Sequence, residues 1–188
     1  MIEQPSYIRI EQKPSLCGPA CLEMIFTRRG KPVSQEKLAL MLDTKVPPGH
    51  ETAYTLPIPI TTDPAKAGTT LEVFSIKVPQ ISRQLGIPLR TTIYHMTDIN
   101  NLSEFLSKHL QAGNDVMVNF KDVLNKEKSG LGHFALISKA AEENIELCDP
   151  WAGNKAFYTV SDNSLAEQIN TKTLTGEKRG IVVFSTAD

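Results

Sequence analysis

Hydrophobic residues follow a helical spacing in the first part of the chain and a strand-like spacing in the last part. A nearly continuous apolar run over residues 17–29 predicts a buried helix. Ser34 is a suitable cap for a second, shorter helix. Further helices are predicted within 70–85, where Pro79 is a point at which the helix could break, and within 98–111.

The predicted strands lie mostly in the second half of the chain. Short runs rich in β-branched and aromatic residues predict strands at 89–95, 116–120, 133–139, 144–149, 156–160 and 180–185. Between Thr44 and Thr70 five prolines interrupt any period, so an irregular segment is expected there. Because helices and strands are segregated along the chain, the pattern indicates an α+β fold in a single domain covering residues 1–188.

Cys17 is the residue of greatest chemical interest, because it stands at the start of the predicted 17–29 helix. The unpaired N–H groups and partial positive charge of a helix N-terminus favour a thiolate over a thiol. The alternative is that Cys17 packs in the core as a small hydrophobic side chain, as a lone cysteine usually does. We favour a nucleophile because two suitable partner groups follow later in the chain.

His133 and Asp149 are these partner groups. His133 follows Gly132 at the start of one predicted strand, and Asp149 ends the next predicted strand, just before Pro150. Their spacing of 16 residues is enough for one hairpin, so the carboxylate could orient the imidazole while the imidazole acts as the base. A histidine facing solvent and an ordinary Asp-Pro turn are the alternatives.

A family resemblance is carried by three motifs in this order: Gln12-Lys-Pro-Ser-Leu-Cys17-Gly-Pro-Ala-Cys, Gly132-His133-Phe-Ala-Leu-Ile and Asp149-Pro150. Together they resemble the papain-like cysteine peptidases of the bacteriocin-processing, or double-glycine leader peptidase, type and their free-standing members. The resemblance implies a helical lobe over about 1–95, with the nucleophile at the N-terminus of a central helix, packed on an antiparallel β lobe over about 96–188. It also implies a thiol-dependent hydrolase that needs no metal or organic cofactor.

In such an enzyme Cys17 would form an acyl-enzyme, His133 would transfer protons and Asp149 would orient His133. Gln12 is the candidate donor to the oxyanion, together with the backbone N–H of Cys17. Removal of one such donor costs about 2.7–4 kcal/mol in other enzymes. Gln4 is a distant second choice for this role.

Three other interpretations of the same residues stay open. Acyl transfer to an amine or thiol, as in phytochelatin-synthase-like relatives, would use the same acyl-enzyme, and a catalytically silent binding module would use the same cleft. A zinc site from Cys17, Cys21, His133 and Cys148 is disfavoured, because Cys-x3-Cys within a helix lacks the paired spacing of zinc modules. We therefore expect Cys21 and Cys148 to be packing residues.

Charge and composition narrow the classes of partner and location. The 188 residues include 20 Lys and Arg against 21 Asp and Glu. This balance favours neither a nucleic-acid nor a membrane partner, so the expected partner is a peptide or protein substrate, with the oligomeric state left open. The three cysteines and the lack of a signal-peptide pattern or a long apolar run predict free thiols and a cytoplasmic location.

Two loops are predicted to flank the cleft and to govern which substrates can enter it. One is the Pro-rich segment Thr44–Thr70, and the other is the charged segment Lys121–Gly130, which leads directly into the Gly132-His133 motif. The alternative for both is a solvated connection without such a role.

Overall fold

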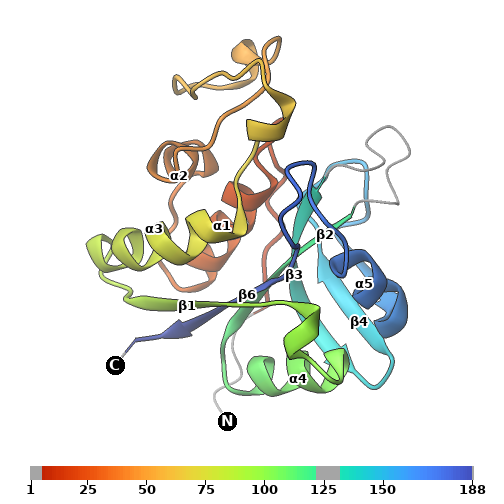
Figure 1. Cartoon of the computed structure of the whole chain (residues 1–188). Helices are drawn as coiled ribbons and strands as arrows, with labels where there is room; N and C mark the ends of the chain where they lie inside the picture. The colour runs from red at the N-terminus through yellow and green to blue at the C-terminus, as the bar shows by residue number, and fades with distance from the viewer. Residues whose placement is uncertain (1–5, 122–131, 188) are drawn as a thin grey trace.

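An antiparallel sheet forms the centre of the molecule (Figure 1). The computed structural model describes residues 6–121 and 132–187, and in these the six strands have the order β1-β6-β2-β3-β4-β5. The strands are β1 (Leu89–Tyr94), β2 (Asp115–Lys121), β3 (Gly132–Ala141), β4 (Asn144–Cys148), β5 (Phe157–Ser161) and β6 (Ile181–Thr186). Every neighbouring pair is antiparallel.

Helices lie on both faces of this sheet. One face is covered by α1, α2 and α3, and the other by α4 and α5 (Figure 1). Their bounds are α1 Cys17–Arg28, α2 Gln35–Met41, α3 Leu71–Gln84, α4 Leu102–Gln111 and α5 Asp162–Ile169, with single 3₁₀ turns at Glu51–Ala53, Pro64–Lys66 and Met96–Asp98. The predicted α+β fold class is confirmed.

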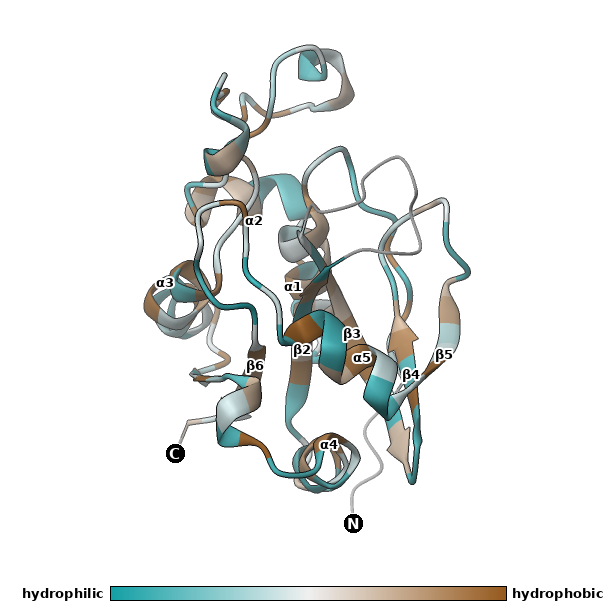
Figure 2. Cartoon of the chain, turned by 45° about the vertical axis from the view of Figure 1, so that its right-hand side comes forward, coloured by the Kyte–Doolittle hydropathy of each residue, from teal (hydrophilic) through white to brown (hydrophobic). Residues whose placement is uncertain are grey.

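Alternation of side chains along the central strands divides the hydrophobic core into two layers. On β6, Val182 and Phe184 pack against α1 and α3, whereas Ile181 and Val183 pack on the side of α4 and α5. The strands β2 and β3 alternate in the same way, so the central strands are apolar on both faces and run through Figure 2 as largely hydrophobic segments. The sheet is therefore a rigid support between two helical layers.

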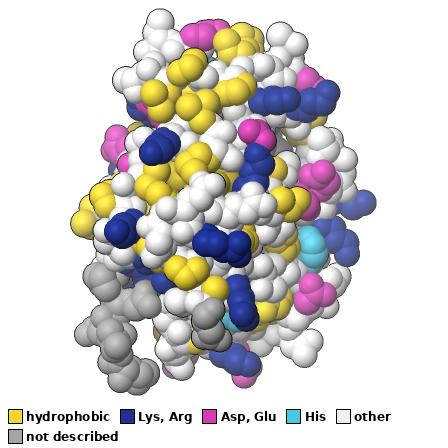
Figure 3. Space-filling view, turned by 90° about the vertical axis from the view of Figure 1, so that its left-hand side faces the viewer, with side chains coloured by type: hydrophobic (Ala, Val, Ile, Leu, Met, Phe, Trp, Pro, Cys, Tyr) yellow, Lys and Arg dark blue, Asp and Glu magenta, His cyan; other side chains and the backbone are white. Residues whose placement is uncertain are grey.

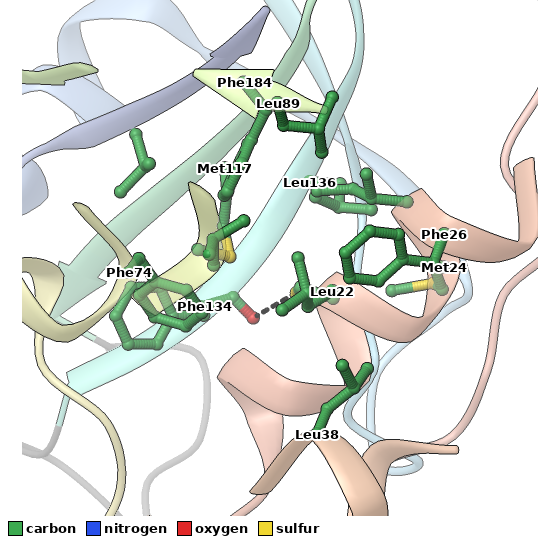
Figure 4. Packing of buried hydrophobic residues seen from close by; sticks show 14 of the residues in the cluster. Leu22, Met24, Phe26, Leu38, Phe74, Leu89, Met117, Phe134, Leu136 and Phe184 are labelled. Atoms are coloured by element: carbon green, nitrogen blue, oxygen red, sulfur yellow. Dashed lines mark hydrogen bonds between the residues drawn. The ribbon is translucent and has the colours of Figure 1, made fainter. Parts of the chain in front are cut away.

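Close packing of α3 on the first turn of α1 explains the glycine that follows Cys17. A Cβ on Gly18 would lie 2.7 Å from Cζ of Phe74, so any side chain there would displace that ring. Phe74 also packs edge-on against Phe134 of β3, with ring centroids 5.3 Å apart (Figure 4). The start of α1 is thus held between α3 and β3.

The structure differs from the predicted elements at α3 and α5. The α3 helix is continuous through Pro79, although proline has no N–H to donate to the carbonyl of Ser75. That carbonyl instead accepts a hydrogen bond of 3.1 Å from Oγ1 of Thr91, so the lost bond is replaced. The sequence patterns did not predict α5, in which only Leu165 and Ile169 are buried. The division into a helical and a β lobe stays a prediction.

The face of the molecule that carries α3 and the 44–70 segment mixes all side-chain types. Acidic, basic and hydrophobic groups alternate across it without a large area of one charge (Figure 3). Ile60 of the 44–70 segment and Ile76 of α3 are exposed hydrophobic residues. Within residues 6–121 and 132–187, no helix has the length and apolar character needed to cross a membrane.

Candidate active site

Cys17 is the first residue of α1, as predicted from the sequence. A tight turn precedes it, in which the N–H of Leu16 donates to the carbonyl of Lys13 at 3.0 Å. Ser15 adopts a φ of +59° in this turn. A non-glycine residue at positive φ costs about 1–3 kcal/mol and persists only where the surrounding structure enforces it. The backbone that delivers the thiol is therefore held in a strained conformation.

A cleft of about 370 Å³ opens beside this thiol. Cys17 lines it together with Gln12, His133 and Trp151. Pro47 and several residues between 64 and 70 form another part of its wall, so the Pro-rich segment does contribute to the cleft. Whether this segment governs substrate access stays a prediction. The second predicted loop, Lys121–Gly130, lies outside the described residues except for Lys121 itself.

His133 and Asp149 are in direct contact. Nε2 of His133 lies 2.7 Å from Oδ1 of Asp149, and both side chains are almost completely buried. His133 also hydrogen-bonds with the thiol of Cys17. Because Asp149 occupies Nε2, Nδ1 is the ring nitrogen left for the sulfur. The structure thus brings together Cys17, His133 and Asp149 in this order, from α1, β3 and the end of β4.

Three further groups hold the Asp149 carboxylate, and sequence reasoning missed their roles. The backbone N–H of Trp151 donates to Oδ1 at 2.8 Å, while Nδ2 of Asn154 and the hydroxyl of Tyr158 donate to Oδ2 at 2.9 and 2.8 Å. The Trp151 contact is the local turn that aspartate often forms two residues ahead. Tyr158 reaches Asp149 because β5 pairs with β4, placing it opposite Leu147, and no local pattern could have revealed this.

Cys17, His133 and Asp149 shift one another's pKa values. Burial would raise the pKa of Cys17, but the hydrogen bond and charge of His133 outweigh it and hold the pKa of the thiol below its ordinary value. Burial would lower the pKa of His133, but hydrogen bonds with Asp149 and Cys17 raise that pKa to about 10. Burial would raise the pKa of Asp149, but His133 holds that pKa below its usual range. The arrangement favours a thiolate, an imidazolium and a carboxylate.

Gln12 lies on the wall of the same cleft, with its backbone fixed on both sides. Its N–H donates to the carbonyl of Pro150 at 2.8 Å. The side-chain amide of Gln35 accepts from the N–H of Lys13 at 2.7 Å and donates to the carbonyl of Glu11 at 2.9 Å. The side-chain Oε1 of Gln12 is buried without a hydrogen-bond partner in the described part of the chain. An unsatisfied buried acceptor costs about 1–3 kcal/mol, which suits an atom whose donor arrives with a ligand. Donation to an oxyanion would come from Nε2 of the same amide, because Oε1 can only accept.

The other two cysteines lie in the hydrophobic core, as expected for packing residues. The thiol of Cys21 donates to the carbonyl of Phe134 at 3.5 Å, and the thiol of Cys148 lies 3.7 Å from the sulfur of Met24. Burial raises the pKa of both thiols, that of Cys148 to about 12. In the ranges that the structure describes, no three His, Cys, Asp or Glu side chains gather in a way that could hold a metal ion.

Comparison with known proteins identifies the fold. No protein-family model and no curated protein matches the sequence. A double glycine motif protease from an AMS/PCAT transporter, solved in complex with the leader peptide, matches with a TM-score of 0.53 and 16% identity, over 100% of this chain and 96% of that one. The peptidase domain of Streptococcus ComA, a bi-functional ABC transporter, matches with a TM-score of 0.57 and 14% identity, over 97% and 100%.

A protein from Bacillus anthracis described as a C39-like peptidase also matches, with a TM-score of 0.57 and 15% identity, over 99% of this chain and 96% of that one. These three structures match along almost their whole lengths. The chain therefore has the papain-like fold of C39 peptidase domains, in agreement with the resemblance read from its motifs.

Proposed function

We propose that this protein is a cysteine peptidase that hydrolyses a peptide or amide bond through an acyl-enzyme on Cys17. The observation that carries the proposal is the chain of contacts from the Cys17 thiol through His133 to the buried Asp149, at the wall of a cleft. The substrate class is a peptide or protein, which is supported by a structure of the same fold that was solved with a leader peptide.

The geometry supports a two-stage reaction. The Cys17 thiolate attacks the carbonyl carbon, and the backbone N–H of Cys17 and the amide of Gln12 stabilise the oxyanion. When the C–N bond breaks, the imidazolium of His133 gives its proton to the leaving amine. His133 then takes a proton from water as its oxygen attacks the thioester, and the C–S bond breaks to release the acid product and restore the Cys17 thiolate beside the His133 imidazolium. Asp149 keeps the imidazole oriented throughout.

The state of the cysteines fits a reducing compartment. Cys17, Cys21 and Cys148 are all free thiols in the structure, and a thiol nucleophile must stay reduced to act. We accordingly place the protein in the cytoplasm. We also propose one domain over residues 1–188, with the helical lobe supplying the nucleophile and the β lobe supplying the base.

Turnover of a mixed peptide set, followed by mass spectrometry of the products, tests the assignment. We expect His133→Ala to abolish turnover, because the proton carrier is lost, and Asp149→Ala to retain part of it, because only orientation is lost. His109→Ala is the matched control, since His109 lies in α4, on the other side of the sheet from α1, and its loss should leave turnover unchanged. Wild-type kinetics in a folded His133→Ala variant would refute the assignment.

The same assay separates hydrolysis from acyl transfer. With an added amine acceptor, a peptidase should release mainly the free acid, whereas an acyltransferase should release the amide of the acceptor. A catalytically silent binding module would give neither product, even where peptides bind to the cleft.

A further inference from the structure

Arg179 places an unusual charge in the wall of the cleft. Its side chain is almost fully buried and yet lines the cleft beside the Cys17 thiol. Nε donates to Oγ1 of Thr171 at 2.9 Å, and Nη1 donates to Oδ1 of Asn119 at 3.1 Å. Both partners are neutral, and no carboxylate in residues 6–121 or 132–187 pairs with this guanidinium. Burial lowers the pKa of Arg179, but an arginine remains charged in a protein.

Two other arginines with mostly buried side chains, unlike Arg179, pair with a carboxylate. Arg28 and Arg29 both form ion pairs with the fully buried carboxylate of Asp115. A buried charge without an opposite charge is costly, because the protein interior cannot replace its hydration. Arg179 therefore holds a positive charge whose counter-charge the described protein does not supply.

The guanidinium also lies close to the proposed base. A Cβ on Gly132 would overlap Nη1 of Arg179, so the glycine before His133 leaves room for the cation. Nδ2 of Asn119 donates to the carbonyl of His133 at 3.4 Å, which links the partner of the cation to the same strand. A group bound at Arg179 would thus lie beside Gly132, in the same cleft as the Cys17 thiol.

Apart from the Cys17 and His133 pair, the other charged residues of the cleft differ from Arg179 in exposure. Glu72, Glu177 and Lys178 line it, but all three are exposed to solvent. Water screens exposed charges strongly, whereas a carboxylate that meets a buried guanidinium gains a charge-assisted, two-pronged hydrogen bond. Arg179 is therefore the group best suited to select the charge of a ligand.

We propose that Arg179 binds a carboxylate of the substrate next to the scissile bond. The enzyme then prefers peptides with an acidic group at that position, either an Asp or Glu side chain or a free C-terminal carboxylate. This inference rests on the proposed peptidase function. It adds a substrate class that the Cys17, His133 and Asp149 contacts do not determine by themselves.

Matched fluorogenic peptides test it, with Glu against Gln at each position around the cleaved bond and with C-terminal acid against amide. We expect one position where the acidic peptide has a kcat/KM at least about 10-fold higher in the wild type. Arg179→Gln should remove this preference, and Arg179→Lys should keep part of it, because the charge remains without the planar fork. Lys178→Gln, which removes an exposed charge from the same cleft, should retain it.

Equal rates for acidic and neutral peptides in the wild type would overturn the inference, even if Arg179→Gln failed to fold. An unchanged preference in Arg179→Gln would also overturn it. If the peptides are cleaved without any preference, only the carboxylate site is wrong and the peptidase assignment stands.

If the wild type cleaves none of the peptides, their binding to a Cys17→Ala variant, measured by calorimetry, tests the carboxylate site separately. Tighter binding of acidic peptides, lost when Arg179→Gln is added, would support the carboxylate site even if the wild type cleaves none of them. If no peptide is cleaved and acidic peptides bind no more tightly than neutral ones, both proposals are contradicted.

Discussion

At the scale of single residues, the side chains that hold the Asp149 carboxylate, Asn154 and Tyr158, both lie later in the chain. Cys17, His133 and Asp149 could be predicted because each stands at the boundary of a predicted element in a recognisable motif. The donors Asn154 and Tyr158 could not, because they meet Asp149 only after β5 pairs with β4. Buried carboxylates need several donors, and those donors come from wherever the fold brings them.

Tyr158→Phe tests the importance of this support for Asp149. The change removes one donor to Oδ2 and leaves the ring in place, so we expect kcat/KM to fall about 2- to 10-fold, corresponding to one ordinary hydrogen bond. Tyr94→Phe is the control, because the Tyr94 ring packs against Phe105 on the other side of the sheet and should keep wild-type kcat/KM. Equal losses in both variants would indicate a general effect on stability.

At the scale of elements, the pattern of apolar residues predicts helices that are buried on most sides. It does not predict helices whose formation or continuity depends on a few contacts. The apolar run of α1 predicted a buried helix because almost every side of that helix meets the core. The α5 helix gave no such signal, since only two of its residues are buried. Continuity at Pro79 depends on Thr91 of β1, which the sequence of α3 cannot show.

Glu36 fixes the Pro-rich segment to the first turn of α2. It forms an ion pair with Lys13, and its other oxygen accepts from the N–H groups of Thr55 and Leu56 at 2.9 and 2.8 Å. Burial would raise the pKa of Glu36, but Lys13, Thr55 and Leu56 outweigh it and hold the pKa at about 2. The carboxylate therefore fixes Thr55 and Leu56 to α2, in the segment that also contributes residues to the wall of the cleft.

Glu36→Gln should lower the free energy of unfolding by about 1–3 kcal/mol at pH 7, because buried donors lose a charged acceptor. Since the folded pKa lies below the unfolded value of 4.5, the wild-type advantage is present above pH 4.5 and is lost as the pH falls toward 2. Urea unfolding between pH 2 and 7 measures it. Glu104→Gln, at an exposed position of α4, should change stability by less than about 0.5 kcal/mol. A pH-independent difference would contradict this assignment.

At the scale of the whole molecule, α1 is fixed at both ends. Its first turn lies between α3 and β3, and Arg28 and Arg29 at its end meet the buried Asp115 at the start of β2. Tyr7 also donates to Asp115 at 2.7 Å. These partners are far apart in the sequence, so their contacts are visible only in the folded structure. The α1 helix runs from the cleft, at Cys17, to the sheet, at Asp115. The thiol is thereby presented to His133 from a rigid element.

Mapping of iodoacetamide adducts at pH 6 tests the central claim most directly. An ordinary thiol is almost wholly protonated at this pH, whereas the lowered pKa of Cys17 and the raised pKa of His133 favour the reactive ion pair. Below the pKa of Cys17 the thiolate is protonated, and above a pH of about 10 His133 loses its charge, so the ion pair is confined between the two. We predict rapid modification of Cys17 alone, slowed in His133→Ala. Equal modification of Cys17, Cys21 and Cys148, or preferential modification of Cys21, would contradict the account.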